Sequence, residues 1–179
     1  MEEKILVAGA GGQGVMLLGK LLAEAAMRGN KFVTYLPAYG AEVRGGTANC
    51  MVVISDFAIG SPYIAQADTL IIMNAPSLDK FKARAAHKAL YLLNSSLIDK
   101  GHGGRGASLR LPFTGTAVKL GNIRVANVVA LGSYLALKKT VSTAEMERII
   151  EAAAPADKKR LVAINLAALR AGMELVKHG

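Results

Sequence analysis

The sequence predicts one three-layer α/β domain with a mixed, largely parallel sheet. Apolar runs of strand length alternate with segments of helix length, which is typical of this class. A glycine-rich turn also joins the first strand run to the first helix. A strand–loop–strand passage around residues 48–60 predicts some antiparallel pairing. The 179 residues suit one domain, 1–179, in which we see no internal repeat and no linker.

The first part of the chain carries three strand runs and one helix. Lys4–Ala8 is a continuous apolar run, which predicts a buried strand. Val15–Met27 is apolar around most of its circumference, so we expect a largely buried helix that stops at the following Gly-Asn pair. Phe32–Leu36 and Ala48–Ser55 are the next two strands, and residues 37–46 form the loop between them.

The second part continues the alternation. Thr69–Met73 and Ala89–Leu93 predict strands, and Pro76 starts a short helix between them. Residues 101–106 hold four glycines and predict a mobile loop. Within Ala107–Leu111, small or apolar residues alternate with polar ones, as is typical of an edge strand. Three further helices are predicted, the second with Ser142 or Thr143 as its cap: Val125–Lys138, Thr143–Ala153 and Asp157–Lys177.

The composition excludes a membrane span. Apolar residues make up 52% and charged residues 20%, but the longest apolar candidate, Val125–Leu137, is shorter than the roughly 18 residues that a span needs. The chain opens on Met-Glu-Glu-Lys and runs straight into a strand, so we see no signal peptide. The single cysteine, Cys50, excludes an internal disulfide and predicts a cytoplasmic protein. We expect the apolar excess to be buried against partner subunits.

The net charge of +9 is unevenly placed, because residues 100–144 contain no Asp or Glu. A field of one sign attracts acidic partners or phosphorylated ligands. A solvated basic face is the alternative interpretation. Nucleic acid is disfavoured as a partner, because aromatic residues make up 5% of the chain and no helix-turn-helix or zinc spacing is present.

The first glycine motif spans residues 9–14. Gly9, Gly11 and Gly14 satisfy G-x-G-x-x-G between a strand and a helix. We expect the first to permit the tight turn, the second to let the backbone approach a phosphate, and the third to allow close helix–strand packing. With Gly12 and Gln13 they form a candidate phosphate loop at a helix N-terminus, where an anion is favoured.

A dinucleotide site needs an acidic residue at the end of the second strand. This sequence has none, because the next acid after Glu24 is Glu42, in a loop. The sequence therefore predicts that the loop does not bind NAD. Two alternatives stay open: a tight turn without a ligand, and binding of another anionic group.

The second glycine motif follows the second strand. It combines glycines with an aromatic ring, opposite charges and a hydroxyl, which favours a binding or interface loop: Tyr39, Gly40, Glu42, Arg44, Gly45, Gly46 and Thr47. The alternative is that Glu42 and Arg44 satisfy each other or loop carbonyls. Cys50 is expected to be a buried, small apolar residue. One thiol cannot hold an iron–sulfur cluster, which needs four ligands.

Together these runs resemble a known family. Ala8-Gly9-Ala10-Gly11-Gly12-Gln13-Gly14-Val15, residues 35–50 and Ile59-Gly60-Ser61-Pro62 are similar to the gamma subunit of 2-oxoacid:ferredoxin oxidoreductases. The resemblance covers the first third of the chain in order and spacing, and Asn127 and Gly132 fit it more loosely. It is greatest for the 2-oxoglutarate and branched-chain members.

The resemblance implies a Rossmann-like domain that works inside a larger enzyme. Such enzymes decarboxylate a 2-oxoacid on thiamine diphosphate, pass the acyl group to coenzyme A, and send electrons through iron–sulfur clusters to ferredoxin. The thiamine and the clusters are implied to lie on companion alpha and beta subunits, with a delta subunit as a further candidate. We expect no catalytic or metal-binding residue in this chain, and an isolated chain that is inactive, with homodimerisation left open.

Other functions remain alternatives. Indolepyruvate oxidoreductase beta subunits share the domain. A free-standing nucleotide-binding enzyme would use the first glycine loop, and a purely structural assembly protein would contact no ligand. The histidines His87, His102 and His178 have no triad context.

Overall fold

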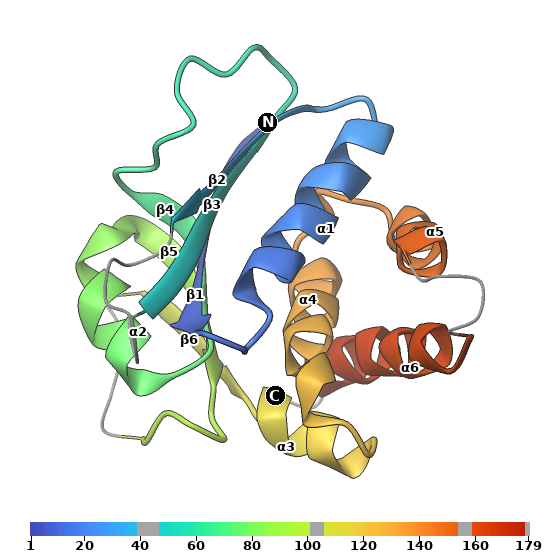
Figure 1. The fold of residues 1–179 in the computed structure, drawn as a ribbon. Coiled ribbons are helices and arrows are strands. Elements are labelled where there is room, and N and C mark those ends of the chain that lie inside the picture. Colours follow the sequence, from blue (N-terminus) through green and yellow to red (C-terminus); the bar gives the residue numbers. More distant parts are fainter. Residues whose placement is uncertain (39–46, 101–105, 154–158, 178–179) are drawn as a thin grey trace.

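One mixed sheet forms the centre of the protein (Figure 1). The structure, a computed structural model, describes residues 1–38, 47–100, 106–153 and 159–177. Its strands lie in the order β2-β3-β1-β4-β5-β6. Their bounds are β1 Glu2–Ala10, β2 Phe32–Ala38, β3 Thr47–Ser55, β4 Ala67–Ile72, β5 Ala85–Asn94 and β6 Ala107–Leu111.

The pairing confirms the predicted mixed sheet. β1 pairs in parallel with β4, β4 with β5, and β5 with β6. β3 lies antiparallel between β1 and β2. β1 is therefore central, and its residues Ile5–Ala8 are fully buried, as their continuous apolar run predicts.

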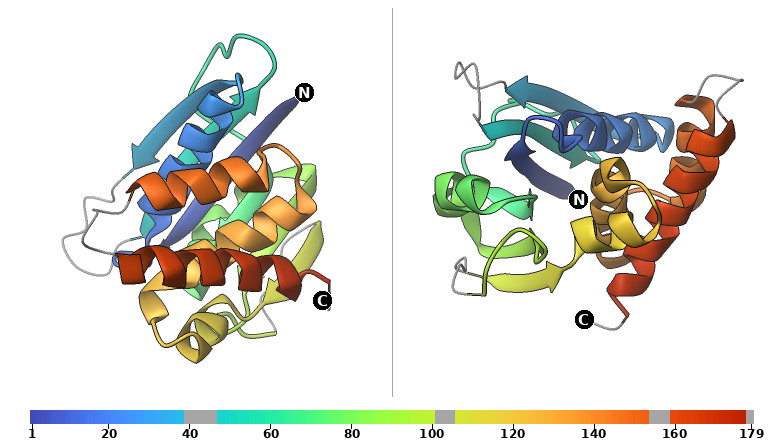
Figure 2. Two further views of the ribbon diagram at one scale, coloured as in Figure 1. Left: turned by 90° about the vertical axis from the view of Figure 1, so that its right-hand side faces the viewer. Right: turned by 60° about the horizontal axis from the view of Figure 1, so that its bottom comes forward.

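Helices cover the two faces of the sheet unequally. Figure 1 shows α2 on one side and α1, α4, α5 and α6 on the other. In the left view of Figure 2, α5 and α6 cross in front of the helices that lie nearer the sheet. The bounds are α1 Val15–Arg28, α2 Ala75–Phe81, α3 Phe113–Lys119, α4 Ala126–Leu137, α5 Thr143–Ala153 and α6 Lys159–Leu175. Short 3₁₀ turns cover η1 Lys82–Arg84 and η2 Ile123–Val125.

The helix α4 is enclosed by protein, with every residue from Ala126 to Leu135 buried. It packs against α6 at two glycines. A Cβ atom on Gly172 would lie 2.8 Å from the carbonyl carbon of Val129, and one on Gly132 would lie 2.9 Å from that of Leu169. Ser133 Oγ donates to the carbonyl of Gly172 at 2.8 Å. The two helices therefore touch backbone to backbone.

The helix α3 is an element that the sequence does not predict. Its Thr-Gly-Thr sequence is a poor helix former. Its first turn is bonded by side chains from the end of β5: Asn94 Oδ1 accepts from Thr114 N at 3.2 Å, and Ser96 Oγ accepts from Gly115 N at 2.9 Å. These caps come from about twenty residues away, so local sequence could not reveal them.

The predicted glycine-rich loop and the predicted edge strand can also be compared with the structure. The mobile loop was expected at residues 101–106, of which 101–105 lie outside the described residues. Ala107–Leu111 is an edge strand, as predicted. In the described ranges, no helix combines the length and the apolar character that crossing a membrane would need.

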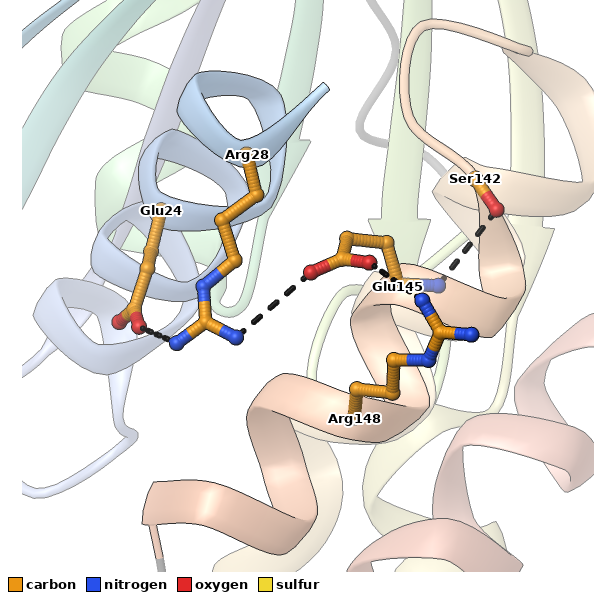
Figure 3. A network of polar contacts seen from close by, with 5 residues as sticks. All are labelled: Glu24, Arg28, Ser142, Glu145 and Arg148. Atoms are coloured by element: carbon orange, nitrogen blue, oxygen red, sulfur yellow. Dashed lines mark hydrogen bonds and ion pairs between the residues drawn. The ribbon is translucent and has the colours of Figure 1, made fainter. Parts of the chain in front are cut away.

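An ionic network ties α5 to α1 (Figure 3). Arg28 lies between Glu24, at 3.0 Å, and Glu145, at 3.6 Å. Glu145 also pairs with Arg148 at 3.3 Å, and its backbone N–H donates to Ser142 Oγ at 3.4 Å. Ser142 is thus the cap that the sequence suggested. Exposed pairs of this kind contribute about 0–1 kcal/mol each, so the network orients α5 more than it stabilises the fold.

Cys50 is buried on β3 behind α1, as expected from its sequence context. Its thiol donates to the carbonyl of Val15 at 3.4 Å, and burial raises the pKa of the thiol to about 12. Because the thiolate is the reactive form, we predict no labelling by iodoacetamide in the native protein near neutral pH. Full labelling in guanidinium is the control. Rapid labelling of the native chain, measured by mass spectrometry, would contradict this burial.

Candidate functional site

The candidate site lies at the edge of the sheet where β1, β4 and β5 end. The first glycine motif connects β1 to α1 at this edge. In doubly wound α/β proteins, ligands bind beyond the carboxyl ends of parallel strands. The motif is thus placed where its sequence predicts, and the side chains around it show what it can do.

Gly9 sits in a crowded position at the start of the turn. A Cβ atom there would lie 2.7 Å from Gln13 Oε1 and 2.9 Å from the side chains of Met73 and Val15. Gln13 closes the turn, because its Oε1 accepts from Ala10 N at 2.7 Å and its Nε2 donates to the Met73 carbonyl at 3.4 Å. Only glycine fits at position 9, which agrees with the predicted tight turn.

Gly11 and Gly12 form the open part of the loop. A Cβ atom at either position would meet nothing within 4 Å, and Gly12 has a φ of 87°. Both residues are exposed. The backbone here is free to be approached closely, which is the property expected of Gly11.

Gly14 differs from its predicted role. It has a φ of 70°, and a Cβ atom there would lie 2.7 Å from the side-chain carbon Cγ of Asn127. Asn127 Nδ2 donates to the Gly14 carbonyl at 3.1 Å. The close contact is therefore with α4, whereas the close approach of α1 to a strand occurs at Gly19, whose Cβ would contact Tyr35 Cε2 at 3.0 Å.

The second glycine motif lies mostly outside the described residues. These are Tyr39, Gly40, Glu42, Arg44, Gly45 and Gly46. Its last residue, Thr47, begins β3 and pairs with Ala10, the last residue of β1. Ala38, where β2 ends, pairs with Asn49 of β3. Both ends of the second motif therefore emerge at the same sheet edge as the first motif, although some thirty residues separate them in sequence.

Two side chains near this edge keep unpaired oxygens. Thr47 Oγ1 and Asn49 Oδ1 are buried and have no hydrogen-bond partner among the described residues. An unpaired buried polar atom costs about 1–3 kcal/mol. Buried polar atoms of native proteins are nearly always hydrogen-bonded, so we expect both oxygens to have a partner beyond the described residues, such as a water molecule.

A second polar cluster at the same edge was missed from the sequence. The carbonyl of Met73 accepts from Asn94 Nδ2 at 3.0 Å as well as from Gln13. Asn94 Nδ2 also donates to Thr114 Oγ1 at 2.8 Å. The position of these residues in the sequence could have indicated the cluster, since Asn74 and Asn94 each directly follow an apolar strand run. These contacts fix the loops after β1, β4 and β6 relative to one another.

The electrostatics around the first motif favour an anion. The first turn of α1 carries no acidic residue, and no side chain caps it. Partial positive charge at a helix N-terminus attracts anions. β2 contains no acidic residue, and it ends at Ala38, so the strand offers no carboxylate for a ribose. Among the described residues, no group of three His, Cys, Asp or Glu side chains could hold a metal ion.

A family model described as pyruvate ferredoxin/flavodoxin oxidoreductase matches residues 4–175. The chain belongs to this family. The resemblance to its gamma subunits is confirmed by a solved structure, the keto/oxoacid ferredoxin oxidoreductase gamma subunit of Geobacter sulfurreducens. That chain is 31% identical, with a TM-score of 0.85 and 99% of both chains covered.

Two relatives of the family differ in length. The chain is 38% identical to ketoisovalerate oxidoreductase subunit VorA of Methanothermobacter thermautotrophicus over 99% of its own length, but spans only 37% of VorA. It is 34% identical to 2-oxoglutarate synthase subunit KorC of Methanocaldococcus jannaschii, covering 99% of this chain and 96% of KorC. The same family domain thus occurs within a longer subunit and as a subunit of this size.

A second solved structure shares the fold at lower identity. It is the 2-oxoglutarate:ferredoxin oxidoreductase of Magnetococcus marinus, described with 2-oxoglutarate, coenzyme A and succinyl-CoA bound. The match has a TM-score of 0.90 and 23% identity, and covers 99% of this chain and 31% of that chain. At this identity the likeness concerns the fold alone.

Proposed function

We propose that this chain is the gamma subunit of a multi-subunit 2-oxoacid:ferredoxin oxidoreductase. The complex oxidatively decarboxylates a 2-oxoacid to its acyl-CoA. The observation that carries the proposal is the end-to-end match to a solved gamma subunit, with 99% of both chains covered. A subunit of this size also exists in KorC, so the domain does not have to be fused to the rest of the enzyme.

Thiamine diphosphate and the iron–sulfur clusters are assigned to companion alpha and beta subunits, with a delta subunit as a further candidate. For the clusters, the residues of this chain support the assignment. It has one cysteine, and that residue is buried with a raised thiol pKa, whereas a cluster needs four thiolate ligands. Ferredoxin would then receive electrons from the companions. We also propose a cytoplasmic location, which the single cysteine favours.

The chain's own contribution is expected at the sheet edge with the two glycine motifs. Gly11, Gly12 and the uncapped start of α1 can accept a phosphate or carboxylate. The loop from Tyr39 to Thr47 is proposed to face the companion subunits near their active site. Coenzyme A is a candidate for direct contact, because it carries phosphates and the Magnetococcus marinus enzyme of this fold holds it.

The proposed substrate is 2-oxoglutarate, on the basis of the KorC relatives. A branched-chain 2-oxoacid is the alternative supported by VorA. The beta subunit of an indolepyruvate oxidoreductase also shares the domain.

Purification through this chain from the organism that makes it tests the proposal. We expect companion subunits to copurify, and the complex to reduce a dye with a 2-oxoacid and coenzyme A. 2-Oxoglutarate, 2-ketoisovalerate, pyruvate and indolepyruvate would be compared at equal concentration. The pure single chain should be inactive and should not bind NAD in calorimetry. An isolated chain that turns over a nicotinamide substrate would instead support a free-standing enzyme.

Arg44 provides a sharper test of the second glycine motif. Its guanidinium could form a bidentate pair with a carboxylate or phosphate, so Arg44→Ala in the complex should lower kcat or raise the KM for coenzyme A. We expect a change of about tenfold, the size of one charge-assisted hydrogen bond of about 1.5 kcal/mol. The matched control is Arg160→Ala, at an exposed position of α6. Unchanged kinetics in both variants would reject a role for Arg44.

A further inference from the structure

The turn between α3 and α4 exposes apolar side chains close in sequence to cations. Two branched apolar side chains, Val118 and Ile123, are 56% and 60% exposed. Two cations, Lys119 and Arg124, flank them and are exposed as well. We call these four residues the corner surface. It lies after the carboxyl end of β6, where α3 protrudes at the bottom of Figure 1.

The backbone of the corner surface is held by local hydrogen bonds. The backbone N–H groups of Gly121 and Asn122 donate to the carbonyls of Val118 and Ala117 at 2.9 and 3.1 Å. Asn122 Oδ1 accepts from Arg124 N at 3.0 Å. Gly121 takes the left-handed conformation, with a φ of 85°, that this turn requires. The exposed apolar side chains are therefore held on a fixed backbone.

A fixed apolar surface is inexpensive to bury in an interface. Val and Ile are stiff at χ1, so docking costs little side-chain entropy, and an ordered backbone loses little more. The residues beneath them are already packed, since Phe113, Ala117 and Val125 are buried. Exposure of Val118 and Ile123 thus adds nothing to the stability of this chain on its own.

The charges around the corner surface indicate what covers it. In the part of the chain that the structure describes, neither Lys119 nor Arg124 takes part in an ion pair. Other cations of the same acid-free stretch do have partners: Lys138 pairs with Glu3 at 3.1 Å, and Arg110 donates to the carbonyl of Ile98. Lys119 and Arg124 have no such partner among the described residues, and the sequence has no acid from residue 100 to 144.

The corner surface is also connected to the candidate site. η2 continues directly into α4, whose second residue, Asn127, bonds to Gly14 at the end of the first glycine motif. Ile123 and Arg124 therefore lie within about one helical turn of the residue that bonds to that motif. The site and the docking surface would then be held by the same helix.

We propose that the corner surface docks an acidic, apolar segment of a companion subunit. The inference rests on the proposed function, in which companions exist. Val118 and Ile123 would form the dry centre of the contact, and Lys119 and Arg124 would pair with Asp or Glu at its rim. A small phosphorylated ligand fits less well, because it would leave the two apolar side chains uncovered.

Binding of variant chains to the companion subunits, purified as the complex and stripped of this chain, tests the inference by biolayer interferometry. Val118→Ser/Ile123→Ser removes the apolar centre, and should raise Kd about tenfold or more through faster dissociation. Lys119→Glu/Arg124→Glu reverses the rim charges. It should slow association about tenfold at low salt and reduce the salt dependence.

The matched control carries the same kinds of change at the opposite edge of the sheet. Phe57 is 72% exposed and follows β3, and Lys88 is exposed near the start of β5. Phe57→Ser/Lys88→Glu should bind as the wild type does. Thermal melts of all variants show whether they fold, which is expected because every substituted side chain is exposed.

The outcomes separate the inference from the proposed function. If the wild-type chain binds the companions and both corner variants bind equally well, the inference is overturned and the proposed function stands. If the corner variants assemble normally but lose affinity for coenzyme A, the surface binds a phosphorylated ligand and the docking proposal is wrong. If the wild-type chain binds no companion, both proposals fail.

Discussion

Gly172→Ala is expected to destabilise the protein by about 3 kcal/mol, the upper part of the range for overpacked cores. The new methyl group would lie 2.8 Å from the carbonyl carbon of Val129 and 3.0 Å from Ser133 N. Both are backbone atoms and cannot move aside alone, so α6 must shift away from α4. Alanine is a better helix former than glycine by about 1 kcal/mol, which offsets only part of this cost.

Thermal unfolding measures the effect. For a chain of this size, about 1 kcal/mol corresponds to roughly 2–4 °C in Tm, so the Tm of Gly172→Ala should fall by about 6–12 °C. Gly60→Ala is the matched control, because a Cβ atom at Gly60 would meet nothing within 4 Å. Its Tm should stay within about 2 °C of the wild type. Equal Tm values for both variants would mean that the helices are not packed at Gly172 as described.

Gly14→Ala should be nearly as costly, for two separable reasons. A left-handed backbone costs alanine about 1–2 kcal/mol, and the methyl group would lie 2.7 Å from Asn127 Cγ, which adds overpacking of about 1–3 kcal/mol. Asn127→Ala alone loses its bond to the Gly14 carbonyl, at about 1 kcal/mol. Because that substitution also removes the clashing carboxamide, the double variant should be more stable than the sum of the single losses predicts.

A double-mutant cycle by urea unfolding gives the coupling, which we expect to be about 1 kcal/mol or more. Gly121→Ala isolates the backbone part of the cost. Its φ is 85°, but a Cβ atom there would meet nothing within 4 Å. It should lose only about 1–2 kcal/mol. Additive losses at Gly14 and Asn127 would show that the glycine motif and α4 do not contact each other in solution.

The sheet was the most predictable part of the fold. Ile5–Ala8 of β1 are buried on both faces of the sheet, and a strand buried in this way is apolar at successive positions. The order of the strands in the sheet was harder to predict from the sequence. That β3 lies between β1 and β2 depends on pairings such as Val7 with Cys50, which join distant residues and leave no local pattern. α3 was missed for the same reason, since its caps come from Asn94 and Ser96.

The candidate site was predictable where backbone geometry determines the residue. Position 9 requires glycine because it is crowded, and position 12 favours glycine because its φ is positive. Requirements of this kind produce a recognisable glycine pattern in the sequence. The contact of Gly14 with Asn127 could not be predicted, because Asn127 lies 113 residues further along the chain. The joining of the two glycine motifs at one edge depends on the pairing of Ala10 with Thr47, which became apparent only with the sheet.

The central position of β1 has a consequence for how the chain is made. β1 leaves the ribosome before either of its neighbours, because β3 and β4 are both encoded after it. Its apolar residues Ile5–Ala8 have no partner strand until β3, which ends at Ser55, has been synthesised, and they lack the second one until β4 ends at Ile72. Until β3 is complete they form an exposed, unpaired strand, which is a hazard for aggregation. The nascent chain should therefore depend on chaperones more than the finished fold does.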